Sequence, residues 1–420
     1  MKLKYGKDEV RLPIQDKNII KILNLKKQKA LLNPENSLKE LFKSPINSPS
    51  LRDLIIQKKA KNVLIIVNDI TRPTPYEVIL PPLLDELHQT GIKKENIIFM
   101  VATGIHRSNS QEEIKGMFGE NIFSAYKFIN HDCDDPHLKD LGKLKSGNKL
   151  WVDPIVSDID FIITTGVIVP HYFAGFSGGR KSILPGICGR RTIEGNHSRM
   201  VHPNARSGNL KDNPVHQEMQ EAAEKVGVDF NINVVTDEHS EIIEIVAGEL
   251  LASWQQGVEI CKQIYICPIE KKADVVIASA GGYPKDINVY QAQKALNNAY
   301  QAIKSGGTII LLAECLEGYG ESTFKNWIEE ENSPDDIIER LNKKFVLGGH
   351  KAYAIAKLTK EVEVILVSSL PPEKVRKLFF IPMENISQAL NYIQDKYGKD
   401  FQAYILPSGN AVLPFSSIPG

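Results

Sequence analysis

One segment of the sequence gathers most of the residue types that can do chemistry. It reads PHYFAGFSGGRKSILPG from Pro170 to Gly186. Its glycines leave backbone amides open to an anion, and Lys181 and Ser182 follow them where a helix would start. A Walker A loop needs its lysine directly after the last glycine, but Arg180 stands between Gly179 and Lys181. The segment is therefore not the phosphate loop of an ordinary NTPase.

Two shorter segments follow apolar runs that we interpret as strands. NDITRPTP comes after VLIIV, and its Arg72, stiffened by nearby prolines, could present a planar fork to a carboxylate or phosphate. The alternative is a loop arginine paired to Asp69. ATGIHR comes after IIFMV, and a histidine at that place, His106, can act as a general base near neutral pH. The alternative there is a hydrogen-bonded loop histidine.

Five motifs in this order resemble those of one known family. PHYFAGFSGGRKSILPG followed by GNHS is similar to the central signature of the lactate racemase family, the nickel-dependent 2-hydroxyacid racemases and epimerases. NDITRP, ATGIHR and the later YQAQK stand where that family has its other motifs. The likeness runs over essentially the whole chain, and five motifs in register make coincidence improbable.

The resemblance implies a nickel cofactor held by named residues. Family members use a nickel-pincer nucleotide (pyridinium-3-thioamide-5-thiocarboxylic acid mononucleotide), bound covalently to a lysine that corresponds to Lys181. His197 corresponds to the protein's nickel ligand, and an imidazole suits the planar mixed field that Ni(II) accepts. The alternatives are an anion-binding lysine and a capping or core histidine. The remaining residues expected to bind the cofactor are Asp69, Ser177, Gly178 and Gly179.

The resemblance also implies a reaction. A hydride leaves C2 of a 2-hydroxy acid for the cofactor while a base removes the hydroxyl proton, and the resulting 2-keto acid receives the hydride on its other face. His106 and His171 match the two alternating acid/base positions. Lactate is the expected substrate, with a larger 2-hydroxy acid as the alternative. The residues expected to bind it are Arg72, Tyr290, Gln291 and Lys294, of which the last two share a helix face; a solvated face is the alternative.

The elements that position these residues follow an alternating pattern of short β-branched runs and amphipathic stretches, which predicts parallel sheets of doubly wound α/β type. We expect strands over 63–67, 97–101 and 161–163. Ser110 with Glu113 three residues later predicts a capped helix start. In such sheets ligands bind beyond the carboxyl ends of the strands, where the motifs stand.

A change of pattern divides the chain. FNINVVTD and IIEIVAG flank a polar DEHSE, which predicts an antiparallel hairpin over 230–246 before a helix over 253–264. We place a boundary at 268/269, giving an N-terminal α/β domain (1–268) with the cofactor and catalytic motifs and a C-terminal one (269–420). Both are expected to be Rossmann-like, with the active site in the cleft between them. The elements expected in the second are strands at 274–279, 308–313, 363–368 and 401–406, and helices at 289–305 and from Ser333.

Composition excludes several classes of partner. Lys plus Arg and Asp plus Glu both number 51 in 420 residues, so no net charge favours a nucleic acid or an anionic membrane. No apolar run approaches a membrane span, and five scattered cysteines fit a reducing compartment. We expect a cytoplasmic enzyme with a small-molecule substrate. The family's cofactor is made by separate accessory proteins, which are the expected maturation partners.

Some chemically rich residues are left aside. HDCDDPH, from His131 to His137, is too short to place four donors around one ion, and we interpret it as a structural turn. The roles of His202 and His216 stay open. Cys188, Tyr172 and Phe173 are expected to line the substrate pocket. A phosphate- or nucleotide-binding protein without redox chemistry remains an alternative, whereas a NAD dehydrogenase is disfavoured because no G-x-G-x-x-G follows a strand.

Overall fold

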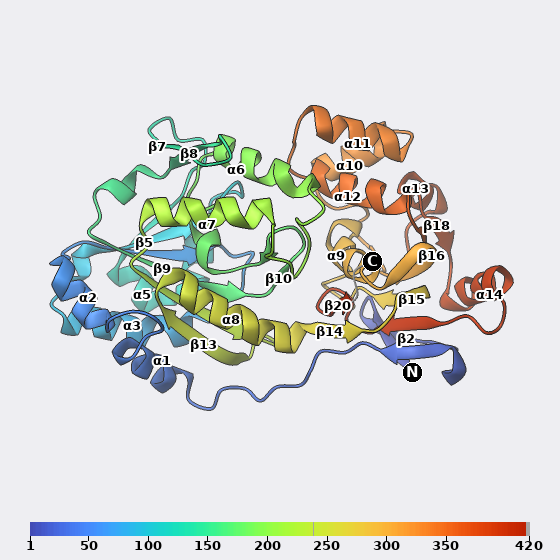
Figure 1. Ribbon diagram of the computed structural model, residues 1–420, viewed down its shortest axis with the longest axis horizontal. Coiled ribbons are helices and arrows are strands. Elements are labelled where there is room, and N and C mark those ends of the chain that lie inside the picture. The colour runs from blue at the N-terminus through green and yellow to red at the C-terminus, as the bar shows by residue number, and fades with distance from the viewer. Residues whose placement is uncertain (238, 417–420) are drawn as a thin grey trace. The chain divides into compact units, whose positions relative to one another are not determined.

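Two α/β units make up the chain in the computed structural model, which describes residues 1–237 and 239–416 (Figure 1). The central unit spans Lys27–Ile264, and the terminal unit combines Met1–Lys26 with the chain from Tyr265 onward. The terminal unit is therefore discontinuous in sequence, whereas the expected boundary at 268/269 is a single cut. Residues 417–420 of the expected C-terminal domain lie outside the described part, as does residue 238 in the expected hairpin turn.

A six-stranded sheet forms the middle of the central unit. Its strands, in spatial order, are β13 (Ile242–Gly248), β12 (Phe230–Thr236), β9 (Phe161–Ile168), β4 (Val63–Asn68), β5 (Ile97–Ala102) and β6 (Lys127–Asn130). All neighbours are parallel except β12 and β13, which form an antiparallel pair at the edge. Two small antiparallel ladders lie outside this sheet: β7 (Lys139–Lys143) with β8 (Lys149–Val152), and β10 (Pro170–His171) with β11 (Gly175–Phe176).

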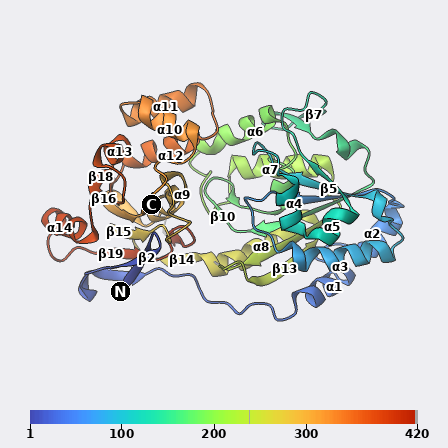
Figure 2. The same ribbon diagram turned by 180° about the vertical axis from the view of Figure 1, so that it is seen from behind.

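Helices cover both faces of the central sheet. Figure 1 shows α7 and α8 before one face, and Figure 2, seen from behind, shows α3, α4 and α5 before the other. The helices of this unit are α1 (Pro34–Lys43), α2 (Leu51–Lys58), α3 (Tyr76–Gln89), α4 (Gln111–Phe118), α5 (Glu120–Ala125), α6 (Arg190–His197), α7 (Pro214–Val226) and α8 (Leu250–Tyr265). Short 3₁₀ turns are η2 (Lys94–Asn96), η3 (Pro154–Ser157), η4 (Gly179–Ser182) and η5 (Ser198–Val201).

The core of the central unit follows the two-residue period of its strands. Val63, Ile65 and Val67 on β4 belong to one hydrophobic cluster, and they pack there with Tyr76 and Leu83 of α3. The intervening residues of β4 are also completely buried. A strand buried on both faces reads as a continuous apolar run, which is why VLIIV was recognisable in the sequence.

The terminal unit contains a second six-stranded sheet, parallel throughout. Its order is β18 (Ile381–Met383), β17 (Glu363–Val367), β16 (Ile303–Leu312), β15 (Ala273–Ser279), β19 (Ala403–Leu406) and β3 (Ile19–Ile22). Smaller ladders pair β1 (Lys2–Tyr5) with β2 (Asp8–Arg11) and β14 (Ile266–Ile269) with β20 (Leu413–Ser416). Its helical elements are η1 (Asp16–Asn18), α9 (Val289–Tyr300), α10 (Ser322–Glu330), α11 (Pro334–Lys343), α12 (Gly349–Thr359), α13 (Pro372–Lys377) and α14 (Ile386–Tyr397).

Most of the expected elements are present. The mixed α/β fold with parallel sheets in two domains is confirmed, as are the capping box of Ser110 with Glu113 and the antiparallel β12–β13 pair. The helix expected over 289–305 is too long, because α9 ends at Tyr300 and β16 begins at Ile303. Ile303 is buried and pairs with Ala273, so a sheet contact overrides the helical pattern there. Among the described residues no helix is both long and apolar enough to cross a bilayer.

Candidate active site

Three neighbouring strands of the central sheet deliver the predicted catalytic residues. β9, β4 and β5 lie side by side and run parallel, so the segments that leave their carboxyl ends start from one edge. Asp69 follows β4 directly, His106 is the fourth residue after β5, and His171 follows β9 within β10. The topology thus brings together side chains that are far apart in sequence.

His106 and Asp69 form a hydrogen-bonded pair. The distance from His106 Nδ1 to Asp69 Oδ2 is 2.6 Å, and the Asp69 side chain is 4% exposed against 45% for His106. Burial alone would raise the pKa of Asp69, but hydrogen bonds from His106 and Thr71 outweigh it and hold that pKa below its ordinary value. An ionised carboxylate only accepts, so His106 donates through Nδ1 and keeps Nε2 for proton transfer.

Arg72 lies on the surface of the same loop and is not paired with Asp69. One Asp69 oxygen accepts from His106, and the other accepts from the Thr71 hydroxyl at 2.7 Å. The Arg72 guanidinium donates to the Thr71 carbonyl at 3.1 Å and to its hydroxyl at 3.3 Å. These are contacts within a turn, so the guanidinium fork can still reach an anionic ligand.

The ring of Phe173 is the centre of the second group of site residues. The ring centroid of Phe173 lies 4.6 Å from that of His171 and 4.9 Å from that of His197, both edge-on. Lys181 Nζ lies 5.8 Å from the same centroid. One buried ring therefore contacts the expected acid/base histidine and nickel ligand, and lies near the expected anchor lysine.

His171 and Lys181 are both surrounded by positive charge and apolar groups. Burial, followed by the charges of Lys181 and Arg72, lowers the pKa of His171 well below its ordinary value. Burial, followed by Arg72 and Arg180, does the same to the pKa of Lys181. The backbone amide of Ala174 donates to His171 Nδ1 at 3.3 Å, so the neutral ring carries its proton on Nε2. A lysine amine with a lowered pKa is a nucleophile.

The glycine-rich segment is held by protein groups on all sides. The Gly179 amide donates to Asn233 Oδ1 at 2.9 Å, and the Ser177 hydroxyl donates to the Val167 carbonyl at 2.7 Å. Trp254 donates its indole N–H to the Ser177 carbonyl at 2.8 Å. The Gly179 amide and the Ser177 hydroxyl therefore already have protein acceptors and are not open to a phosphate. Its geometry instead fixes the backbone beside Lys181.

A close backbone approach explains one glycine of the motif. Gly175 has φ 78°, and a Cβ there would lie 2.5 Å from the Asn209 carbonyl oxygen. The β10–β11 hairpin pairs Gly175 with His171, so the glycine sets the position of that histidine.

The nickel-ligand candidate, His197, is the last residue of α6 and is 7% exposed. Asn196, next to it, donates to the Glu218 carboxylate at 2.8 Å and to the Val215 carbonyl at 3.1 Å. Both acceptors belong to α7, so the end of α6 is tied to a second helix. Such contacts fix the direction of a ligand side chain.

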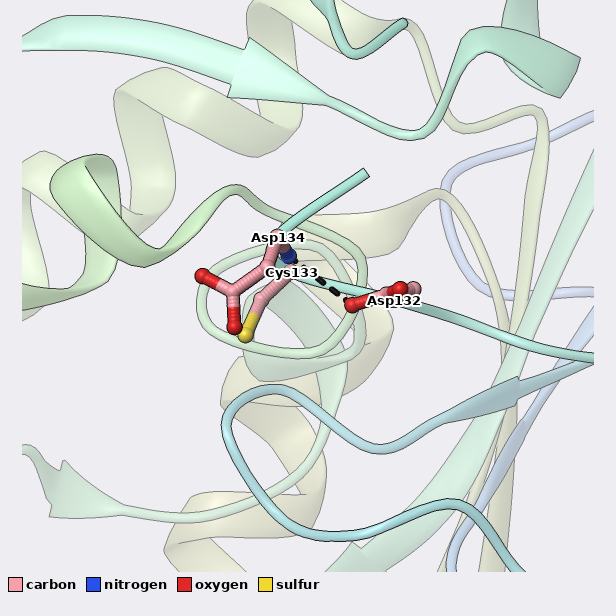
Figure 3. Close-up of side chains that lie close together, drawn as sticks. All are labelled: Asp132, Cys133 and Asp134. Carbon is pink, nitrogen blue, oxygen red and sulfur yellow. Dashed lines mark hydrogen bonds between the residues drawn. The ribbon is translucent and has the colours of Figure 1, made fainter. Parts of the chain in front are cut away.

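The short segment rich in potential metal ligands has other partners. The side chains of Asp132, Cys133 and Asp134 lie close together (Figure 3). Arg190, however, binds both oxygens of Asp134, at 2.7 and 2.6 Å, and burial raises the pKa of the Cys133 thiol to about 11. His131 contacts Asp153 and the Cys188 carbonyl, each at 2.9 Å. These contacts support a structural role.

The structure differs from the sequence analysis at Cys188, which was expected to line the substrate pocket, and at Arg180, which was given no role. Cys188 is completely buried and contacts the Ile183 carbonyl, so it does not line an open pocket. Arg180, noted in the sequence only for breaking a Walker A motif, is a fully buried cation whose Nε donates to His216. A charged residue inside an apolar and glycine-rich motif was the available signal.

The residues expected from the terminal unit stand at the start of α9. Asn288 caps this helix, and Lys294 Nζ donates to Gln291 Oε1 at 3.1 Å. Lys351, which the sequence did not point to, donates to the Tyr290 carbonyl at 2.5 Å and lies 3.7 Å from the centroid of its ring. Lys351 therefore fixes the first turn of α9.

Fold and site together define a class: a two-domain α/β protein whose central sheet presents a carboxylate-bound histidine, a second histidine and a lysine of lowered pKa. The Lactate racemase N-terminal domain family matches residues 5–208, and the Lactate racemase C-terminal domain family matches residues 269–413. This chain therefore belongs to the lactate racemase family. It is an isomerase.

Named relatives agree over nearly the full length. The chain is 34% identical to the lactate racemase of Thermoanaerobacterium thermosaccharolyticum over 98% of both chains, and 33% identical to that of Lactiplantibacillus plantarum over 91% of both. The lactate racemase apoprotein structure from T. thermosaccharolyticum matches with a TM-score of 0.92 over 99% of both chains at 34% identity. A Thermotoga maritima protein, 21% identical, shares the fold with a TM-score of 0.65 over 93% of this chain and 100% of its own.

Proposed function

We propose that this chain racemises a small 2-hydroxy acid, with lactate as the first candidate because both curated relatives are named lactate racemase. In the proposed reaction the C2–H bond breaks as a hydride while the hydroxyl proton is removed, and a 2-keto acid forms. Return of the hydride to the other face gives the opposite enantiomer. The observation that carries this proposal is the presence of two histidines with different hydrogen-bond partners, His106 beyond β5 and His171 beyond β9, the strands on either side of β4.

The residues present fit the nickel-pincer nucleotide that the family implies. Lys181 has the lowered pKa that leaves an amine free to be acylated, and His197 offers an imidazole beside the same Phe173 ring. We therefore assign the covalent attachment to Lys181 and the nickel ligand to His197. The bound cofactor supplies the acceptor and donor of the hydride.

Other residues of the motif hold the site in shape. We propose that Ser177, Gly178 and Gly179 serve the cofactor by fixing the backbone beside Lys181, since their segment is bound by Asn233 and Trp254. The proposed role of Asp69 is to orient His106.

The two histidines take and return the hydroxyl proton. His106 holds its Nδ1 proton on Asp69, so Nε2 is ready to accept a proton, and the carboxylate stabilises the resulting imidazolium. His171 is kept neutral by its lowered pKa, and it accepts at Nδ1 once the weak contact of that nitrogen with the Ala174 amide is released. Each histidine thereby serves one enantiomer.

Substrate binding needs cations for the carboxylate. We propose that Arg72 binds it through two parallel N–H donors, because its guanidinium is not taken up by Asp69. Tyr290, Gln291 and Lys294 are proposed as further substrate-binding residues from their place in the family's YQAQK motif. Their α9 helix is capped and braced in a way that suits a fixed binding group.

The test is to produce the protein together with the cofactor-forming accessory proteins. We expect a mass addition on Lys181, bound nickel, loss of optical purity from an enantiopure 2-hydroxy acid, and full retention of deuterium at C2. Lys181→Arg is the control, because it keeps a cation that cannot be acylated. Exchange of the C2 deuterium with water would contradict hydride transfer. Mass and nickel equal in both proteins would contradict the assignment of Lys181.

The same protein preparation also distinguishes between the candidate substrates. If a larger 2-hydroxy acid is racemised faster than lactate, that acid replaces lactate as the proposed substrate, and the reaction type stays the same. We also propose a cytoplasmic location, in which the accessory proteins meet this chain, and fractionation of the host cells tests it.

A further inference from the structure

Arg180 is a buried cation with only neutral partners. Its guanidinium donates to His216 Nδ1 at 2.9 Å, to the Ala174 carbonyl at 2.8 Å and to the Phe176 carbonyl at 3.1 Å. The guanidinium carbon lies 3.8 Å from the ring centroid of Trp254. Within residues 1–237 and 239–416 no carboxylate forms an ion pair with it. Its side chain is completely inaccessible to solvent.

This arrangement is costly, because a buried charge is ordinarily paired with an opposite one. Burial lowers the pKa of Arg180 to about 9, which leaves it charged at neutral pH. Burial and the charge of Arg180 lower the pKa of His216 to about 3, so this histidine stays neutral. A glutamate at position 216 would also accept from Arg180 and would cancel its charge. The chain has a neutral acceptor there instead.

The charge of Arg180 acts on His216, His171 and Lys181, and of these Lys181 is its direct neighbour in the chain. Both stand in the single 3₁₀ turn η4, which Asn233 and Trp254 fix against the sheet. Burial is the largest cause of the lowered pKa of Lys181, and the charges of Arg72, from the loop after β4, and of Arg180 add to it. His171, from β10, interacts with the same lysine and is neutral. Arg180 is the one of these cations that no solvent screens, because Arg72 is exposed.

We propose that Arg180 is a positioning residue whose uncompensated charge, together with burial and Arg72, keeps the Lys181 amine in its neutral, nucleophilic form, and that His216 serves as an acceptor that leaves this charge intact. The proposal rests on the proposed function of Lys181 as the cofactor's anchor. It gives a role to Arg180 and His216, whose contact would otherwise only destabilise the fold by burying an unpaired charge. It also explains why a charged residue follows the glycines of the motif.

The sharpest test compares His216→Glu with His216→Gln in the full-length protein without cofactor. The two side chains have nearly the same shape, and both can accept from Arg180 Nε. Only glutamate adds a negative charge. A purely structural role of the contact predicts the same behaviour from both variants, or better folding of the ion-paired one.

The readout is competitive acetylation with acetic anhydride over a range of pH, followed by mass spectrometry of the Lys181 peptide. The neutral amine attacks the anhydride carbonyl, a new N–C bond forms, acetate leaves, and the amine proton passes to solvent. Exposed Lys94 is the internal reference. We expect Lys181 to react at lower pH than Lys94 in the wild type and in His216→Gln, and its midpoint to rise by about one unit or more in His216→Glu.

Equal Lys181 midpoints in the two variants would overturn the proposal, as would a wild-type midpoint at or above that of Lys94. If circular dichroism shows that a His216 variant is unfolded, Arg180→Lys and Arg180→Gln form a second pair of variants. Of these two, only Arg180→Lys should keep the low midpoint of Lys181 acetylation. Failure of the proposed function looks different. The wild type would then gain no mass on Lys181 when matured, whatever the acetylation profile shows.

Discussion

His106 Nδ1 lies 2.6 Å from Asp69 Oδ2 and thereby joins the loop after β5 to the loop after β4. The carboxylate is almost completely buried, whereas the imidazole remains partly exposed. This is the arrangement in which a buried acid orients a histidine and stabilises its protonated form. Asp69 therefore orients His106, one of the two proposed acid/base residues.

Asp69→Asn should leave the fold intact and lower kcat by about two to four orders of magnitude, with a smaller change in KM. An amide cannot stabilise the imidazolium, and it also permits the wrong tautomer of His106. Racemisation kinetics of the cofactor-loaded enzyme provide the measurement. Asp158→Asn, which removes an exposed carboxylate of the same unit, is the control and should change neither constant. A drop confined to KM would argue that Asp69 binds substrate instead.

His106→Gln and His171→Gln should each abolish full racemisation but spare a different half of the reaction. In the proposed reaction each histidine takes the hydroxyl proton of one enantiomer, so each variant should still oxidise the other enantiomer once. The measurement is the amount of 2-keto acid released by acid quench after a single turnover with each pure enantiomer. Loss of the same enantiomer in both variants would contradict alternating roles.

Phe173→Leu should reduce the retention of nickel and cofactor more than it reduces stability. The ring contacts His171 and His197 and lies near Lys181, so a smaller side chain leaves these groups free to change rotamer. The loss of stability should be about 1–2 kcal/mol. Phe118→Leu is the control, because it makes the same substitution in the main hydrophobic cluster of the central unit, to which Phe173 does not belong. If the two variants lose similar free energies of unfolding and also retain equal amounts of nickel, the prediction is wrong.

Stability should fall on mild acidification because of His216. Its pKa is about 3 in the folded protein against an ordinary value of 6.5, so the unfolded chain binds a proton first as the pH drops. The stabilisation is therefore complete above pH 6.5 and is lost progressively towards pH 3, at a slope of about 1.4 kcal/mol per pH unit. Urea unfolding at several pH values should show a shallower slope for His216→Gln. An unchanged slope would mean that His216 is protonated in the folded state.

The sequence by itself determined the local elements and the order of the motifs. VLIIV and IIFMV were recognisable as strands because both of their faces are buried, and Ser110 with Glu113 marked a helix start through contacts three residues apart. Family resemblance added the candidate roles of Lys181 and His197. The strands, the helix start and the motifs could be predicted from the sequence because each depends on local interactions or on a pattern shared with relatives.

Only the tertiary structure decided which of these residues meet. Asp69 and His106 are 37 positions apart, and their hydrogen bond exists because β4 and β5 are adjacent. β3 lies at the start of the chain yet pairs with β19 near its end. The sequence did not predict the burial of Arg180, whose side chain the structure packs against His216 and Trp254. Such contacts depend on strand order and packing, and no local pattern encodes these.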